Sequence, residues 1–260
     1  MAFARRWCCA LAPVVLWSQT SSGTTGVAIW TPNRAVLAID SRVTLTAGDV
    51  VRRGTDECKL KSLGRFFVAI AGLYDHAATR FDAWSLAEEA VAGAGSVSEA
   101  AAQAERRIVP ELRTAMWNMQ ASDLAGFARH YTQAHMAILV AGMERGAPAM
   151  AGREFLPDRN AAIQVVRWET APGTASIFVF GEHGAIDRAY GHEVHGQRKG
   201  LSDLIGSLGP AEAARSLVQL EIAGAPQSVG PPIAILQIGD AGPAWIERGL
   251  CGFGAAQPLP

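Results

Sequence analysis

The sequence predicts a single α+β domain in which helices cover the outer faces of packed sheets. Three observations predict it. Strand-like apolar segments come first, two helical segments follow, and strands, one helix and further strands complete the chain. Of the 260 residues, 49% are hydrophobic and only 18% are charged, which is typical of a core-rich globular protein. No linker or change of composition divides residues 24–260, so we expect one domain there.

The predicted domain begins with a β-hairpin. Residues 26–30 and 35–39 are both apolar runs, and Pro32-Asn33 between them is typical of a turn. A third apolar run over residues 65–71 ends at a glycine and is expected to be a buried strand. The intervening residues 43–57 are mixed and polar.

Two helices are predicted next. Apolar side chains recur every three or four residues between 81 and 91, and again between 100 and 119. Glycines at 93 and 95 separate the two stripes, and Ser96 or Ser98 can cap the second helix. Pro110 lies inside the second stripe, where it predicts a kink or a longer first turn.

Short strands are expected again in the second half of the chain, over residues 136–141, 163–168 and 176–180. A helix is predicted over residues 211–223, because Pro210 suits its first turn and Gly224 its end. Residues 233–238 and 244–246 are expected to form the last hairpin.

Residues 1–23 have the three parts of a secretory signal. Two arginines form a positive start, residues 7–17 are apolar, and residues 18–23 are small and polar, which favours cleavage after Gly23. We therefore expect a cleavable signal peptide or propeptide, with a frayed N-terminus of no export value as the alternative. Export would make the protein periplasmic or secreted; the alternative is a cytoplasmic protein that processes itself.

Net charge and apolar run lengths limit the classes of partner, and the cysteine content limits the possible disulfides. The 23 basic and 24 acidic residues give a net charge of −1, which offers no support for a nucleic-acid or anionic-membrane partner. No apolar run approaches the length of a membrane-spanning helix, so no membrane contact is expected beyond the export signal. Removal of residues 1–23 would leave Cys58 and Cys251, which either pair in an oxidising compartment or stay as buried thiols.

Cleavage after Gly23 would give Thr24 a free α-amine beside its hydroxyl. The reference pKa of an α-amine is about 7.7–8.0, so at neutral pH this amine can accept the hydroxyl proton. Such a site needs a nearby cation that favours the neutral amine, and an acid that holds the cation. Asp40, Arg42 and Lys59 are the candidates for these two roles.

The sequence resembles the proteasome β-type N-terminal nucleophile (Ntn) hydrolases, as an exported bacterial member of that family. The matching residues are Gly23-Thr24-Thr25, Val36 to Arg42 with Asp40-Ser41-Arg42 at its end, Lys59-Leu60, and Ala69-Ile70-Ala71-Gly72-Leu73. Asp40 follows Thr24 by sixteen residues, as in the family, whereas Thr25 misses this spacing by one. The resemblance implies a four-layer αββα sandwich, in which helices face two central sheets.

The resemblance also implies catalytic roles. Thr24 would be the nucleophile and, through its amine, the general base. Lys59 would be the neighbouring cation, held by Asp40, and Arg42 would shape the same site. Ser228 would correspond to the serine of a turn that supports the nucleophile, although Ala225 stands where an acid is expected. No serine is assigned to the mid-chain position of the family site.

For substrate binding, the resemblance implies that Thr44 grips an extended substrate through its backbone and that the Gly72 amide donates to the oxyanion. Val43 and Ile70 would form a modest apolar wall. The chain is thus predicted to be a threonine-type peptidase or amidohydrolase for peptide or amide substrates, without metal or cofactor, and a homo-oligomer is plausible.

Two further interpretations remain. A catalytically silent protein that acts as a binding or assembly module is the alternative function, and Ala225 favours it. The sequence His192-Glu193-Val194-His195 lacks the spacing of a helical zinc site and is expected to be a solvated loop.

Overall fold

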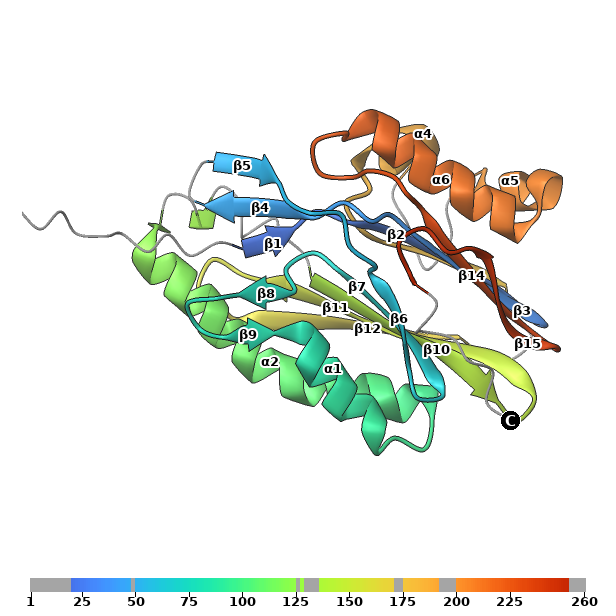
Figure 1. The fold of residues 1–260 in the computed structure, drawn as a ribbon, viewed down its shortest axis with the longest axis horizontal. Helices are drawn as coiled ribbons and strands as arrows, with labels where there is room; N and C mark the ends of the chain where they lie inside the picture. Colours follow the sequence, from blue (N-terminus) through green and yellow to red (C-terminus); the bar gives the residue numbers. More distant parts are fainter. Residues whose placement is uncertain are drawn as a thin grey trace, which may run out of the picture.

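The computed structural model describes residues 20–47, 50–124, 127–128, 136–170, 175–191 and 200–252. Its strands form three five-stranded antiparallel sheets, and its helices lie in two groups (Figure 1). Of the predicted leader, residues 1–19 lie outside this description, as do His192–His195.

The N-terminal sheet contains short strands. Its order is β5 (Val50–Arg53), β4 (Thr44–Ala47), β1 (Thr20–Ser22), β8 (Asp75–His76) and β9 (Phe81–Asp82). The central strand, β1, pairs with β4 on one side and with β8 on the other. The last residues of the predicted leader are thus part of a sheet.

The second sheet carries helices on one face. Its order is β12 (Ile163–Glu169), β11 (Ala147–Pro157), β10 (Met136–Glu144), β7 (Phe66–Ala71) and β6 (Leu60–Leu63). Helices α1 (Ala83–Ala92) and α2 (Val97–Ser122) pack against it through a shared apolar core (Figure 1). Asp82 and Ser96 cap these helices by accepting bonds from backbone N–H groups of the first turn. Pro110 lies within α2 without ending it.

The third sheet holds the two predicted hairpins. Its order is β13 (Ser176–Gly181), β2 (Thr25–Thr31), β3 (Arg34–Ile39), β14 (Ala234–Gly239) and β15 (Gly242–Glu247). Helices α4 (Gly184–Tyr190), α5 (Leu201–Leu208) and α6 (Pro210–Gly224) cover its outer face.

Both faces of β2 and β3 are buried, which explains their continuous apolar runs. Val27 and Ile29 belong to the core beneath α6, whereas Ala28 and Leu37 belong to the core shared by the second and third sheets. Because each fully buried aliphatic side chain contributes roughly 1.5–3 kcal/mol, this hairpin is anchored from two sides. It provides the fixed base of the site described below.

The α+β class is confirmed, but the prediction of a proteasome-like four-layer αββα sandwich is wrong. The strands are divided among three antiparallel sheets rather than two. The additional sheet comes from the end of the predicted leader, the polar segment 43–57 and residues 75–82, for which no strand was predicted. Its strands are two to four residues long. The pairs β4–β5 and β8–β9 are local, and β1 joins them by long-range backbone pairing that local hydrophobic patterns do not reveal.

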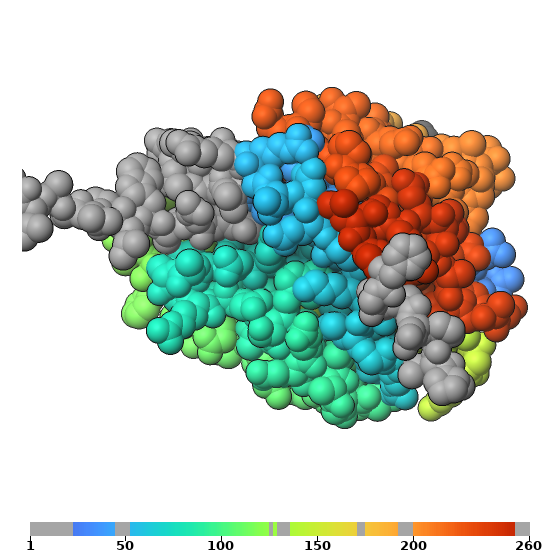
Figure 2. All heavy atoms as spheres, viewed as in Figure 1, coloured from blue at the N-terminus to red at the C-terminus, as the bar shows by residue number. Residues whose placement is uncertain are grey.

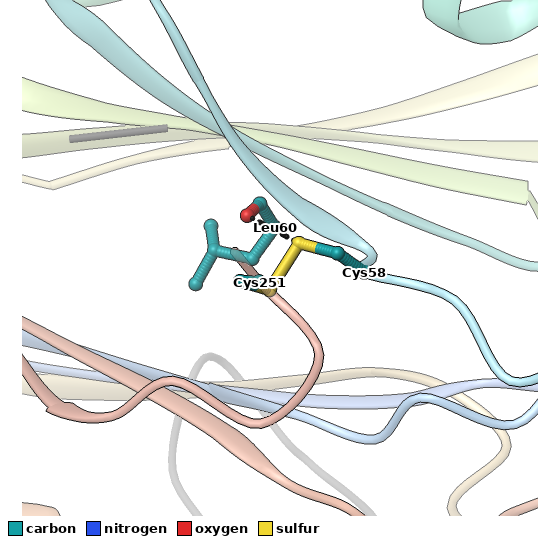
Figure 3. Close-up of a disulfide and its surroundings, with 3 residues drawn as sticks. All are labelled: Cys58, Leu60 and Cys251. Atoms are coloured by element: carbon teal, nitrogen blue, oxygen red, sulfur yellow. Dashed lines mark hydrogen bonds between the residues drawn. A yellow bond between two sulfur atoms is a disulfide. The ribbon is translucent and has the colours of Figure 1, made fainter. Parts of the chain in front are cut away.

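A disulfide joins Cys58, just before β6, to Cys251, which follows β15 (Figure 3). Their Cα atoms are 4.8 Å apart and 193 residues apart in sequence. Of the two possibilities left open by the sequence, the structure shows the paired one. On the face in Figure 2, the light-blue early segment and the red segment near the C-terminus lie side by side, as this bond requires. No helix in the described part of the chain combines the length and apolarity needed to span a membrane.

Candidate functional site

Thr24 lies where the chain passes from the N-terminal sheet to the third sheet. Gly23 makes this passage with a φ of 87°, between β1 and β2. The Thr24 side chain is fully buried, and its backbone carbonyl accepts a 2.7 Å bond from the Glu182 amide after β13. The hydroxyl of neighbouring Thr25 donates to the Glu182 carbonyl, so this hydroxyl is bound to the backbone and not to the site.

The Asp40 carboxylate is held rigidly at the end of β3. Its Oδ1 accepts from the Thr25 amide at 3.0 Å, and its Oδ2 accepts from the amides of Arg42 at 2.9 Å and Gly230 at 3.0 Å. Asp40 has no exposed surface. Three backbone donors therefore fix both oxygens of a buried carboxylate and favour its ionised form.

The buried Lys59 ammonium connects Asp40 with the residue before Thr24. Its Nζ lies 3.2 Å from Asp40 Oδ1 and donates to the Gly23 carbonyl oxygen at 2.9 Å. It also donates to the Arg42 carbonyl. The three acceptors satisfy all three protons of an ammonium group.

Burial dominates the titration of this ion pair. It raises the pKa of the Asp40 carboxyl, while Lys59 and the three backbone donors act in the opposite direction. It lowers the pKa of the Lys59 ammonium, against the attraction of Asp40. The attraction of Asp40 thus works against burial to keep the lysine charged.

A single carbonyl group is the focus of the site. The Thr24 hydroxyl donates to the Gly23 carbonyl oxygen, which also accepts the bond from Lys59. Two donors on one carbonyl oxygen withdraw electron density from its carbon. The peptide bond between Gly23 and Thr24 is thus polarised beside a potential nucleophile.

The loop that follows α6 closes the site. The Arg42 guanidinium donates to the carbonyls of Pro226 and, at 3.2 Å, Val229. The Ser228 amide donates to the Ala225 carbonyl at 3.1 Å, and the Ser228 hydroxyl lies 3.4 Å from the same oxygen. Arg42 therefore acts on the loop and not on Thr24, and the position of Ala225 supplies a backbone acceptor rather than an acid.

Of the four predicted substrate-binding residues, two lie at strand ends and two lie in the apolar core. Thr44 is 2% exposed, lies beside Gly23, and its hydroxyl has no hydrogen-bond partner in the part of the chain that the structure describes. Gly72 is buried and follows β7 with a φ of 81°. Val43 and Ile70 lie in the apolar core beneath α1 and α2, with exposed fractions of 2% and 0%. The structure gives these two residues no open surface.

Gly181 is a site residue that the sequence interpretation missed. It lies opposite Thr25 with a φ of 78°, and a Cβ at this position would be 2.0 Å from the Thr24 carbonyl oxygen. The glycine immediately after an apolar strand was the available signal, since a left-handed residue often marks such a close approach. Its pairing with residue 25 could not be inferred from local pattern.

No known family matches the chain, and a search of curated proteins finds no related one. Within the described ranges, no three His, Cys, Asp or Glu side chains are arranged to hold a metal ion.

Proposed function

We propose that the protein is an N-terminal threonine amidohydrolase that cleaves peptide or related amide bonds by acyl transfer to Thr24. One observation carries the proposal: the Thr24 hydroxyl and the Lys59 ammonium meet on the same carbonyl oxygen, and Asp40 holds the lysine. These residues are also the ones through which the sequence resembles the proteasome β-type Ntn hydrolases.

The chain's own peptide bond is the first substrate of this site. The Thr24 Oγ adds to the Gly23 carbonyl carbon, the bond from that carbon to the Thr24 nitrogen breaks, and the hydroxyl proton passes to this nitrogen. The product is an ester on Thr24 beside a new α-amine. Water then hydrolyses the ester, which restores the hydroxyl and releases the preceding segment as a carboxylic acid.

Turnover uses the new α-amine as the general base. It takes the hydroxyl proton during attack on a substrate carbonyl and gives it to the leaving amine. The neighbouring Lys59 charge favours the neutral form of this amine, and the fixed Asp40 carboxylate keeps the lysine in place. The Lys59 bond to the carbonyl oxygen also stabilises negative charge that develops there.

The Cys58–Cys251 disulfide favours an oxidising location. We therefore propose a periplasmic or secreted protein, with a cytoplasmic one as the alternative.

The test combines intact mass, N-terminal sequencing and labelling by a threonine-directed electrophile. We expect the wild-type chain to begin at Thr24 and to be labelled once at this residue. The Thr24→Ala variant should keep Gly23 and remain unlabelled, whereas the neighbouring Thr25→Ala variant, as a control, should still be processed. A wild-type chain that keeps Gly23 would contradict the proposal, because the threonine nitrogen would remain in an amide bond.

A catalytically silent binding or assembly module is the second candidate. The observation that favours it is Ala225, which stands where the resemblance places an acid. A chain that begins at Thr24, is folded, and reacts with no electrophile or amide would support this candidate instead.

A further inference from the structure

We infer that the mature site accepts glycine as the residue whose carbonyl is attacked, and that it discriminates against every acyl donor with a side chain there. The substrate class is therefore extended peptides with a glycyl amide bond. This inference rests on the proposed function and specifies its substrate.

Gly23 shows where the acyl residue of a substrate must lie. Its carbonyl oxygen contacts both the Thr24 hydroxyl and the Lys59 ammonium. A separate substrate would present its carbonyl to the same two groups, because the nucleophile and the cation are the same. The surroundings of Gly23 thus describe the subsite for the attacked residue.

This subsite has no room for a side chain. A Cβ on Gly23 would lie 2.7 Å from the Ser228 carbonyl oxygen, 2.7 Å from Thr44 Oγ1 and 3.2 Å from Ser228 Cβ. The first contact is with backbone, which cannot swing aside as the end of a long side chain does. Any larger residue would therefore have to displace the loop.

The loop is tied to the ion pair, so its displacement would disturb catalysis. The Val229 carbonyl accepts from Arg42, and the Gly230 amide donates to Asp40 at 3.0 Å. Moving residue 228 outward would strain both bonds and shift the carboxylate that holds Lys59. The wall of the subsite is thus part of the catalytic framework.

Backbone conformation selects glycine independently. Gly23 has a φ of 87°, in the left-handed region that L-residues with a Cβ rarely adopt. This conformation alone disfavours such a residue by about 5- to 150-fold. Together with the close contacts, we expect at least about 100-fold selectivity for glycine over alanine.

The residues before the glycine must be extended. In β1, Ser22 pairs with Thr44, and Thr20 pairs with His76 of β8 (Figure 1). Release of β1 would leave a slot between β4 and β8 in which both neighbouring strands offer backbone hydrogen bonds. A peptide fills this slot by strand addition on two edges.

The reaction on such a substrate is balanced with water as the second reactant. A bond forms between Thr24 Oγ and the glycyl carbonyl carbon, and the bond from this carbon to the amine breaks. The hydroxyl proton passes through the α-amine to the departing amine. Water then cleaves the ester, giving a peptide with a C-terminal glycine carboxylate and the restored hydroxyl.

The experiment compares fluorogenic peptide amides on the mature chain, after mass spectrometry has verified Thr24 as its first residue. The series is acetyl-Thr-Ser-Ser-X-aminomethylcoumarin, with glycine, alanine, leucine or arginine at X. We expect kcat/KM for glycine to exceed that for each other residue by at least about 100-fold. Hydrolysis of the alanine or leucine substrate within about tenfold of glycine overturns the inference while the hydrolase proposal stands.

Variants of the full chain test the same subsite without added substrate. Gly23→Ala should block self-processing in a chain that still unfolds cooperatively in urea, at a midpoint below that of Thr24→Ala because of the added contacts. Ser22→Ala should be processed as the wild type is. Normal processing of Gly23→Ala would contradict glycine selection. Failure of every amide substrate together with failure of electrophile labelling would refute the proposed function, and the inference with it.

Discussion

Replacing Asp40 by asparagine should destabilise the protein strongly. The substitution removes the charge that faces the buried Lys59 at 3.2 Å. It also places an amide NH2 where one carboxylate oxygen accepted hydrogen bonds. If the remaining oxygen keeps the amides of Arg42 and Gly230, the Thr25 amide loses its acceptor.

The contacts of Asp40 determine how much stability the substitution should remove. Removing one partner of a buried ion pair typically costs about 3–5 kcal/mol, and an unsatisfied buried amide costs about 1–3 kcal/mol. Burial already lowers the pKa of Lys59, so loss of its proton limits the first cost. We expect a total of about 4 kcal/mol, which lowers Tm by about 8–16 °C in a chain of this size.

Urea denaturation followed by tryptophan fluorescence measures this loss. All variants carry Thr24→Ala, so that processing does not change the chain. The control is Glu89→Gln, which breaks the exposed pair of Arg107 and Glu89 and should cost less than about 1 kcal/mol. Lys59→Met and the double variant with Asp40→Asn complete a cycle, in which we expect a coupling of at least about 1.5 kcal/mol. Equal losses of stability in Asp40→Asn and Glu89→Gln would refute the ion-pair reasoning. So would a double variant whose loss equals the sum of the losses in Asp40→Asn and Lys59→Met.

Three further predictions concern other parts of the fold. The Cys58–Cys251 disulfide joins residues 193 positions apart in sequence and so restricts the unfolded chain. Its removal by serine substitution or reduction should lower the free energy of unfolding by about 2–5 kcal/mol. An unchanged urea midpoint under dithiothreitol would contradict this. Burial lowers the pKa of His76 in the folded protein. Below the unfolded pKa of about 6.5, the unfolded chain therefore binds more protons than the folded one, and the free energy of unfolding decreases as the pH decreases, by up to about 1.4 kcal/mol per pH unit. In His76→Gln the urea midpoint should change less between pH 7.5 and 4.5, and an unaltered profile would exclude His76 as the cause. Gly181→Ala places a Cβ 2.0 Å from a backbone oxygen at a φ of 78°, so it should lower the free energy of unfolding by more than about 3 kcal/mol. The control is Gly206→Ala in α5, where a Cβ meets nothing within 4 Å and the change should be neutral or stabilising. Similar urea midpoints for the two variants would contradict the predicted contact at Gly181.

The cluster of Thr24, Asp40 and Lys59 could be predicted because local structure brings these residues together. The hairpin register places Asp40 beside Thr25, and the Asp40 amide donates to the Thr25 carbonyl at 3.2 Å. A strand–turn–strand segment of this length returns the chain to its starting point, so a spacing of sixteen residues has geometric meaning. The roles assigned to the three residues remain predictions.

The N-terminal sheet, and the contact of Gly181 with the site, could not be predicted in this way. Strands β1, β4 and β8 are two to four residues long, and they form one sheet because β1 pairs with two segments that are distant in sequence. The contact of Gly181 with residue 24 likewise joins positions with no common local pattern. Helices α4 and α5 and strand β11 were also missed, although the periodicity of α1, α2 and α6 was recognised.

The long-range hydrogen bonds of Asp40 determine when, during synthesis of the chain, the site can form. Its bond to the Gly230 amide spans 190 residues, and β3 gains its partner β14 only when residue 239 has been made. A ribosome-bound chain therefore contains the threonine, the acid and the lysine long before their final scaffold can assemble. Self-cleavage, as proposed above, is delayed until the protein is almost complete, and a truncated chain keeps its first residues.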